Sequence, residues 1–296
     1  MSEPRTAPPG LAPTADLLQS PSSVTTGLRL RARGASAAST TVPPLIVLAV
    51  VVAGWVMVSE VLLAPDKRFL LPPPWDVVNV GFLDTQNLTE ILAGVWLTAK
   101  AALIGLALSI VLGMGLAIAM SQAAWIERSL FPYAVVLQTI PILALVPLVG
   151  FTLGYDFSSR VLVCVLIALF PIITNTLFGL LSVDQGQHDL FTLHKAGRWT
   201  RLRKLQLPAA MPAVFTGFRV AAGASVIGAV VGDFFFKQGD PGIGVLIDLY
   251  SSQLESERLY AAVIASSLLG IAVFVLVGVL NQRIVGRWHT STRAGS

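Results

Sequence analysis

Five cationic side chains lie within ten residues of a chain that is otherwise strongly apolar. The segment that contains them runs from Asp189 to Leu207-Pro208, and its cations are Lys195, Arg198, Arg201, Arg203 and Lys204. Burying five cations in hydrocarbon would cost many kcal/mol, so this segment must lie in water or against a partner. Apolar residues stand among the cations. This mixture suits an amphipathic helix that inserts apolar side chains into a partner's groove while its cations bind the rim.

The residue patterns of common catalytic and metal sites do not occur in this sequence. It has no GxxxxGK motif followed by Ser or Thr, so we expect no ATP hydrolysis by that route. The histidines, His188, His194 and His289, are not accompanied by a ligand cluster, so we expect no metal site. Cys164 is the single cysteine and lies in an apolar run, where we predict a small packing residue.

The composition indicates an integral membrane protein. Of the 296 residues, 54% are hydrophobic and only 12% are charged, which is too apolar for a soluble domain. The formal net charge is +4, and the cations stand at the edges of apolar runs, so nucleic-acid binding is a poor explanation for the basic balance. The fold class that we predict is all-α and polytopic.

Six apolar runs are long enough to cross a bilayer as helices. They lie at about 45–63, 92–120, 131–153, 160–182, 211–235 and 260–283. An even number of spans places both termini on one side of the membrane. Lysine and arginine are concentrated on that same side, and the other side is acidic, so the positive-inside rule predicts that both termini and the 183–210 loop are cytoplasmic.

These runs divide the chain into four parts. Residues 1–42 are rich in Pro, Ser, Thr, Ala and Gly, which predicts a disordered cytoplasmic tail. Residues 43–87 hold the first span and an external linker. Residues 88–288 form the transmembrane core, and 289–296 form a short cytoplasmic tail.

Several polar residues within the apolar runs are candidates for lining or gating a passage. Each also has a purely structural interpretation: an end-of-helix lysine that reaches the interface, interhelical hydrogen bonds, or a cap or ion pair. The candidates are Lys100, Gln138, Thr139, Asn175, Arg219 and Asp233. Gly105, Ser109, Gly113 and Ala117 fall four apart in one run and predict a helix face that another helix can approach closely.

The run HKAGRWTRLRKLQLPAAMPAVFTGFRVAAGASVIGAVVGDFF resembles the signature region of the membrane subunit of type I ABC importers, in the nitrate, sulfonate and taurine group. The family's loop has a Glu-Ala-Ala start, a glycine, and a Leu-Pro end. Counting back from Leu207-Pro208, Asp189 takes the glutamate position, Leu190 and Phe191 the two alanines, and Lys195 the glycine. The resemblance assigns ATPase coupling to Asp189, Leu190, Phe191, Lys195, Ala196, Gly197, Arg198, Trp199, Arg201, Leu207 and Pro208. We expect Pro208 to end the amphipathic helix before the next span.

The resemblance, which covers about 88–288, implies a permease of an ATP-binding cassette importer in a bacterial inner membrane. It implies a second permease copy or a related chain, two cytoplasmic ATPase subunits docked on the basic loops, and an external solute-binding protein. ATP would be bound by the partner subunit, so this chain would need no cofactor. Nitrate, sulfonates, taurine, and pyrimidine or vitamin-like precursors are the implied substrates. Asp233 would take the place of the acidic residue before a Gly-x-Gly turn, here Gly242-Ile243-Gly244.

Two other functions fit parts of the pattern. An ion-gradient-driven secondary carrier would need paired intramembrane charges, broken helices and an internal repeat, of which only Lys100 gives a hint. A non-transporting membrane scaffold would share the basic binding loop without a solvent-accessible path.

Overall fold

The computed structural model describes residues 37–285, and every regular element in that range is a helix. The predicted all-α class is therefore confirmed for this part of the chain. Most of the predicted amino-terminal tail and all of the predicted carboxy-terminal tail, 289–296, lie outside the described residues. The chain divides after Gly54 into two compact units, each of which is described by itself.

The described part of the first unit is a single apolar helix. Helix α1, Ala37–Met57, begins before the start at about residue 45 that the sequence predicts. Every described side chain from Val42 to Ala53 is exposed. Val42–Leu62 is long and apolar enough to cross a membrane, which agrees with the first predicted span.

The second unit opens with short helices joined by side-chain hydrogen bonds. They are η1, Val58–Leu62; η2, Pro65–Leu70; α2, Pro74–Val78; and η3, Asn79–Leu83. Trp55 Nε1 donates to the Pro72 carbonyl at 3.0 Å, and the Ser59 hydroxyl donates to the Leu71 carbonyl at 2.7 Å. The proline-rich segment is thereby fixed to the helix end that precedes it.

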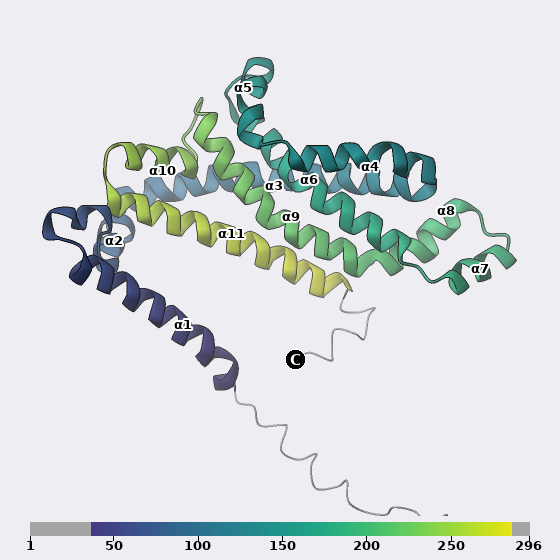
Figure 1. Ribbon diagram of the computed structural model, residues 1–296, viewed down its shortest axis with the longest axis horizontal. Helices are drawn as coiled ribbons and strands as arrows, with labels where there is room; N and C mark the ends of the chain where they lie inside the picture. The colour runs from purple at the N-terminus through teal and green to yellow at the C-terminus, as the bar shows by residue number, and fades with distance from the viewer. Residues whose placement is uncertain (1–36, 286–296) are drawn as a thin grey trace, which may run out of the picture. The chain divides into compact units, whose positions relative to one another are not determined.

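Four long helices pack side by side and form the main layer of the second unit (Figure 1). They are α3, Thr85–Gln122; α6, Phe157–Leu181; α9, Leu207–Phe235; and α11, Ser256–Val285. Their shared core is built largely from alanines, among them Ala102, Ala168 and Ala222. Small side chains let helix backbones come close, which is the main source of helix association in lipid.

The predicted small-residue face of α3 packs against α6. Gly105, Ser109, Gly113 and Ala117 are all buried, and the Ser109 hydroxyl reaches the Val165 carbonyl at 3.3 Å. Cys164 lies between Gly105 of α3 and Gly228 of α9, and a Cβ on Gly228 would stand 2.9 Å from the Cys164 Cα. Cys164 is therefore a buried packing residue, as predicted.

The third predicted span, 131–153, is broken. Helix α4, Ala124–Thr139, and helix α5, Ile142–Leu153, meet at an angle of 99°. Pro141 stands at the break, where it lacks the N–H that would continue the helix. The described residues hold five helices of spanning length and composition, or up to six if the bent pair counts as one, so the six-span prediction stands with its third span bent.

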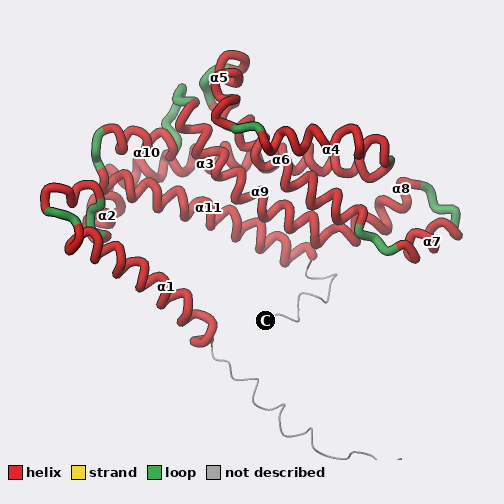
Figure 2. The backbone as a smooth tube through the Cα atoms, viewed as in Figure 1, coloured by secondary structure: helices red, strands yellow, loops and turns green. Residues whose placement is uncertain are grey.

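Shorter helices lie at the two ends of the four-helix layer. At one end are α7, Gln185–Leu193; α8, Arg198–Arg201; and η4, Leu202–Gln206. At the other end lie α2 and α10, Ile243–Ser252 (Figure 1). The non-helical connections between α4 and α5 and between α7 and α8 are visible in Figure 2.

Candidate functional site

The basic segment folds as two short helices joined by a tight turn, and we call the part from Gln185 to Arg201 the α7–α8 corner. Helix α7 ends in a Schellman motif: the Ala196 N–H donates to the Phe191 carbonyl and the Lys195 N–H to the Thr192 carbonyl, both at 2.9 Å. Lys195 has a φ of 51°, in the left-handed region that glycine adopts most easily. This is the position at which the resembling family carries glycine.

The helix that follows does not end at Pro208, so that expectation is wrong. The chain stays helical from Arg198 to Phe235, with Pro208 in the first turn of α9. The preceding turn, η4, is a π-helix in which the Leu207 N–H donates to the Leu202 carbonyl. Such a widened turn gives the proline ring room that a regular α-helical turn lacks.

Phe191 of the basic segment is half-buried, and the other apolar side chains considered separate into two groups. Leu190, Leu193 and Trp199 are 53%, 81% and 70% exposed. Leu202 and Leu205 are instead 1% and 9% exposed, and Leu202 packs with residues of α6 and α9. Only the first group is available to a partner, whereas the second attaches the corner to the helix layer.

The cations of the segment are mostly free for outside contacts. Arg201 Nη2 donates to the Thr192 hydroxyl at 3.1 Å and so ties α8 to α7. Within residues 37–285 none of the five cations forms an ion pair. Asp189 is exposed, and Gln185 Nε2 of its own helix lies 3.4 Å from its Oδ1. The corner is therefore a firmly linked structure with an apolar tip and unpaired positive charge.

The predicted passage residues do not gather in one place. Lys100 is exposed, with its Nζ 5.2 Å from the centre of the Trp96 ring. Gln138 and Thr139 are exposed at the end of α4. Asn175 donates to the Pro171 carbonyl of its own helix at 2.8 Å.

The two remaining candidates lie on α9. The Arg219 guanidinium stands 5.3 Å from the centre of the Phe274 ring of α11. Asp233 is fully buried near the carboxyl end of α9, at the opposite end of the layer from the corner.

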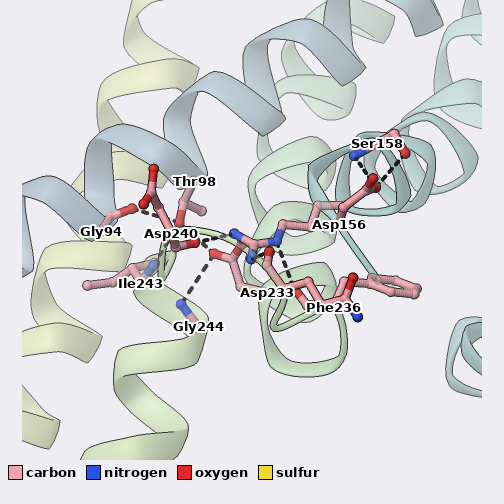
Figure 3. A network of polar contacts seen from close by, with 11 residues as sticks. Gly94, Thr98, Asp156, Ser158, Asp233, Phe236, Asp240, Ile243 and Gly244 are labelled. Atoms are coloured by element: carbon pink, nitrogen blue, oxygen red, sulfur yellow. Dashed lines mark hydrogen bonds and ion pairs between the residues drawn. The ribbon is translucent and has the colours of Figure 1, made fainter. Parts of the chain in front are cut away.

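Asp233 belongs to a buried polar network that we call the Arg160 cluster, formed by Thr98, Arg160, Asp233 and the backbone of 236–244 (Figure 3). Arg160 Nη1 lies 3.2 Å from Asp233 Oδ1, and the two side chains are 1% and 0% exposed. The guanidinium also donates to three backbone carbonyls, those of Phe236, Gln238 and Asp240, at 2.8, 3.0 and 3.1 Å. Arg160 thus fixes the α9–α10 loop to α6.

The other oxygen of Asp233 joins two further helices. The Thr98 hydroxyl of α3 donates to Asp233 Oδ2 at 2.6 Å and accepts from the Ile243 N–H at 2.8 Å. The Gly244 N–H lies 3.3 Å from the same oxygen. The backbone of Gly242 lies against the carboxylate so closely that a Cβ there would collide with it. The Gly-x-Gly turn is therefore explained by close approach to Asp233.

The first turn of α6, which carries Arg160, is stabilised by a cap. Asp156 Oδ1 accepts from the Ser158 hydroxyl at 2.6 Å and from the Ser158 N–H at 3.1 Å. These bonds, the hydroxyl first, hold the pKa of the Asp156 carboxyl below its ordinary value. The cap helps to fix the direction in which Arg160 leaves the helix.

Comparison with known proteins identifies the group to which the chain is related. A family model described as "Binding-protein-dependent transport system inner membrane component" matches residues 109–286. That match begins within α3, at residue 109, and continues through α11, so it includes the α7–α8 corner and, apart from Thr98, the side chains of the Arg160 cluster. The chain belongs to this family.

Curated relatives of this permease come from several bacteria. It is 35% identical over 73% of its length to the formylaminopyrimidine transport permease protein of Halalkalibacterium halodurans, of which 85% is covered. It is 29% identical over 79% of its length to the riboflavin transport system permease protein of Chloroflexus aurantiacus, also covered to 85%. The nitrate import permease protein of Leptolyngbya laminosa is 33% identical over 62% of the chain and is covered to 63%.

Membership of this family confirms the class of protein that the sequence resemblance implied. The chain is a multi-pass inner-membrane permease subunit of an ATP-binding cassette importer, a family that works with an ATPase and a binding protein. Family membership also argues against the two alternative functions, an ion-gradient-driven secondary carrier and a non-transporting membrane scaffold.

Sequence reasoning missed Thr98 and Arg160 of the permease as functional candidates. In the sequence, Arg160 is the first residue of the predicted span 160–182, so the pattern assigns it only to the boundary of that span. The available signal was a lone arginine beginning one apolar run and a lone aspartate ending another. Opposite charges within spans are expected to pair.

Proposed function

We propose that the α7–α8 corner is the surface through which a cytoplasmic ATPase subunit moves this permease. The observation that carries the proposal is the exposure of Leu193 and Trp199 on a corner whose own backbone is fixed by a Schellman motif and by the Arg201–Thr192 bond. Exposed apolar anchors within a polar, cationic rim are typical of a binding surface. A rigid corner can transmit force, whereas a loose loop would absorb it.

The corner is joined directly to a long helix. Because the chain is helical from Arg198 to Phe235, displacement at Trp199 is delivered to α9 without a flexible joint. A helix of that length spans roughly 57 Å at 1.5 Å per residue. At its far end Asp233 connects α9 to α3 and α6, so the three helices would tilt together.

In the proposed assembly, two permease copies, or this chain and a related one, form the passage. Two ATPase subunits bind ATP and dock on the two corners, and an external binding protein delivers the solute. ATP-driven closure of the ATPase pair alternates the passage between inward-facing and outward-facing states. The excess of lysine and arginine in the loops on one side supports cytoplasmic termini and a cytoplasmic corner.

The solute is a small molecule of the kinds named for the relatives: nitrate, an aliphatic sulfonate, formylaminopyrimidine or riboflavin. The resemblance extends this set to taurine and to pyrimidine or vitamin precursors as a class. Selection among them is shared with the binding protein, which captures the solute first.

The double variant Trp199→Ala with Arg198→Glu tests the docking surface. Both side chains are exposed, so we expect normal membrane insertion but loss of the ATPase from the purified complex. The measurement is the amount of ATPase recovered with an affinity-tagged permease from membranes.

Trp75→Ala is the matched control, because Trp75 is also exposed but belongs to α2, at the other end of the layer. It should leave ATPase recovery unchanged. Undiminished recovery of the ATPase with the double variant would refute the docking assignment.

A further inference from the structure

A cavity lies beside the break between helices α4 and α5. Its volume is about 340 Å³, which is at the small end of the range for ligand pockets. Gln138, Ile140 and Ile142 line it from the break, and Leu166, Phe170 and Pro171 line it from α6. No residue on its wall is charged.

The break leaves backbone polar groups available beside this cavity. Pro141 has no N–H, so the Leu137 carbonyl four residues earlier has no helical donor. Within the described residues, the Ile142 and Leu143 N–H groups at the start of α5 likewise have no backbone partner, whereas the Ala144 N–H donates to the Pro141 carbonyl at 2.9 Å. The Gln138 side chain, which is exposed, forms no hydrogen bond with any residue of the described range.

Unpaired backbone within this bent apolar helix pair restricts what can fill the cavity. Within the hydrocarbon region, non-helical backbone is tolerated only where it is buried in protein or lines a water-filled path. Discontinuous spanning helices also mark the solute sites of several transporter folds, because their ends supply hydrogen-bonding groups. A lipid chain would leave these groups unsatisfied, whereas a hydrated solute would pair with them.

The chemistry of the wall selects among solutes. An anion could accept from the N–H groups at the start of α5, but no positive side chain on this wall would neutralise its charge and offset the cost of leaving water. A flat ring can pack on the Phe170 ring and the aliphatic side chains, and the Gln138 amide can both donate to and accept from the edge of a heterocycle. A neutral ring compound is therefore favoured over nitrate or a sulfonate.

We propose that the cavity at the α4–α5 break is the intramembrane contact site for the transported solute, and that this solute is a neutral, planar heterocycle. The inference rests on the proposed function and narrows its substrate class. Gln138 contacts the hydrogen-bonding edge of the ring, and Phe170 contacts its face.

The single native cysteine makes a direct test possible. Gln138→Cys is built in a Cys164→Ala background, with Cys164→Ser as a second background because residue 164 is buried. The permease with its ATPase is reconstituted in liposomes, and modification by a water-soluble methanethiosulfonate reagent is timed with cytosine, nitrate or ethanesulfonate at saturating concentration. We expect modification, slowed several-fold by cytosine and unchanged by the two anions.

Ser252→Cys is the control position, since Ser252 is exposed at the end of α10, outside the spanning helices, and does not line the cavity. Its modification should not depend on cytosine. An unreactive Gln138→Cys in both backgrounds would overturn the site. Protection by an anion, or by none of the three probes, would overturn the ligand class.

Recovery of the ATPase is measured on the same preparations. Retained ATPase together with an unprotected cysteine counts against this inference alone. Loss of the ATPase from the parent protein would instead count against the proposed function.

Discussion

The α7–α8 corner and the Arg160 cluster use similar residue types in opposite environments. Both combine arginine with polar and apolar neighbours, and they lie at opposite ends of the helix layer. At the corner, Arg198 and Trp199 are exposed, and neither Arg198 nor Arg201 is paired with an acid within the described residues. In the cluster, Arg160 and Asp233 are almost completely buried, and the guanidinium is surrounded by one carboxylate and three carbonyls.

This difference separates two roles for charge in a membrane protein. A buried charge is tolerated only when its partners are all present, so the cluster fixes one arrangement of α3, α6, α9 and the α9–α10 loop. An exposed, unpaired charge contributes little to the stability of its own chain and is available to a second one. Substitutions in the cluster should therefore change the fold, and substitutions at the corner should change the assembly.

The largest expected effect is that of Asp233→Ala. Removing the carboxylate leaves the buried Arg160 uncompensated, which costs about 3–5 kcal/mol in comparable pairs. The purified permease should show a much lower thermal midpoint in detergent, or no folded protein at all.

Asp240→Ala is the matched control for that substitution. Arg160 bonds to the backbone carbonyl of Asp240 and not to its exposed side chain, so stability should hardly change. Equal stability of the two variants would mean that the ion pair does not support the fold.

A second comparison uses two leucines of the basic segment. Leu202→Ala removes a buried side chain and should destabilise the permease by about 2–5 kcal/mol. Leu193→Ala removes an exposed one and should change stability by less than about 0.5 kcal/mol while weakening ATPase binding. Thermal midpoints and ATPase recovery are measured for both variants. The midpoint should fall in Leu202→Ala, and in Leu193→Ala the recovery should fall while the midpoint hardly changes. A clearly lower midpoint in Leu193→Ala would contradict the assignment of Leu193 to the partner surface.

The smallest expected effect is a gain in stability from Lys195→Gly. A left-handed residue other than glycine costs about 1–2 kcal/mol. Glycine at position 195 would remove this cost, but its greater freedom in the unfolded chain offsets about 0.4–1 kcal/mol of the gain in stability. A modest rise in thermal midpoint should follow, and Lys195→Val should lower it. A fall with glycine would contradict the φ of 51° at this position.

Much of this architecture follows from the sequence because it depends on local composition. Apolar runs of spanning length, the small-residue face of α3 and the position of the basic segment could all be predicted from neighbouring residues. The family resemblance then supplied the partners, which composition alone could not.

The missed features depend on packing between distant parts of the chain. Pro132, Pro141 and Pro147 look equivalent in sequence, yet only Pro141 stands at a break. Pro208 is accommodated by the π-helical turn η4, which no local sequence pattern indicates. The pairing of Arg160 with Asp233 requires knowing that the start of α6 meets the end of α9.

Site-specific cross-linking tests the central claim most directly. A photo-reactive residue replaces either Leu193, on the corner, or Leu254, which is 66% exposed between α10 and α11 at the other end of the layer. In native membranes, the account predicts that the ATPase is captured from position 193 and not from position 254. Capture from position 254 alone, or from neither position in membranes that contain the assembled importer, would contradict it.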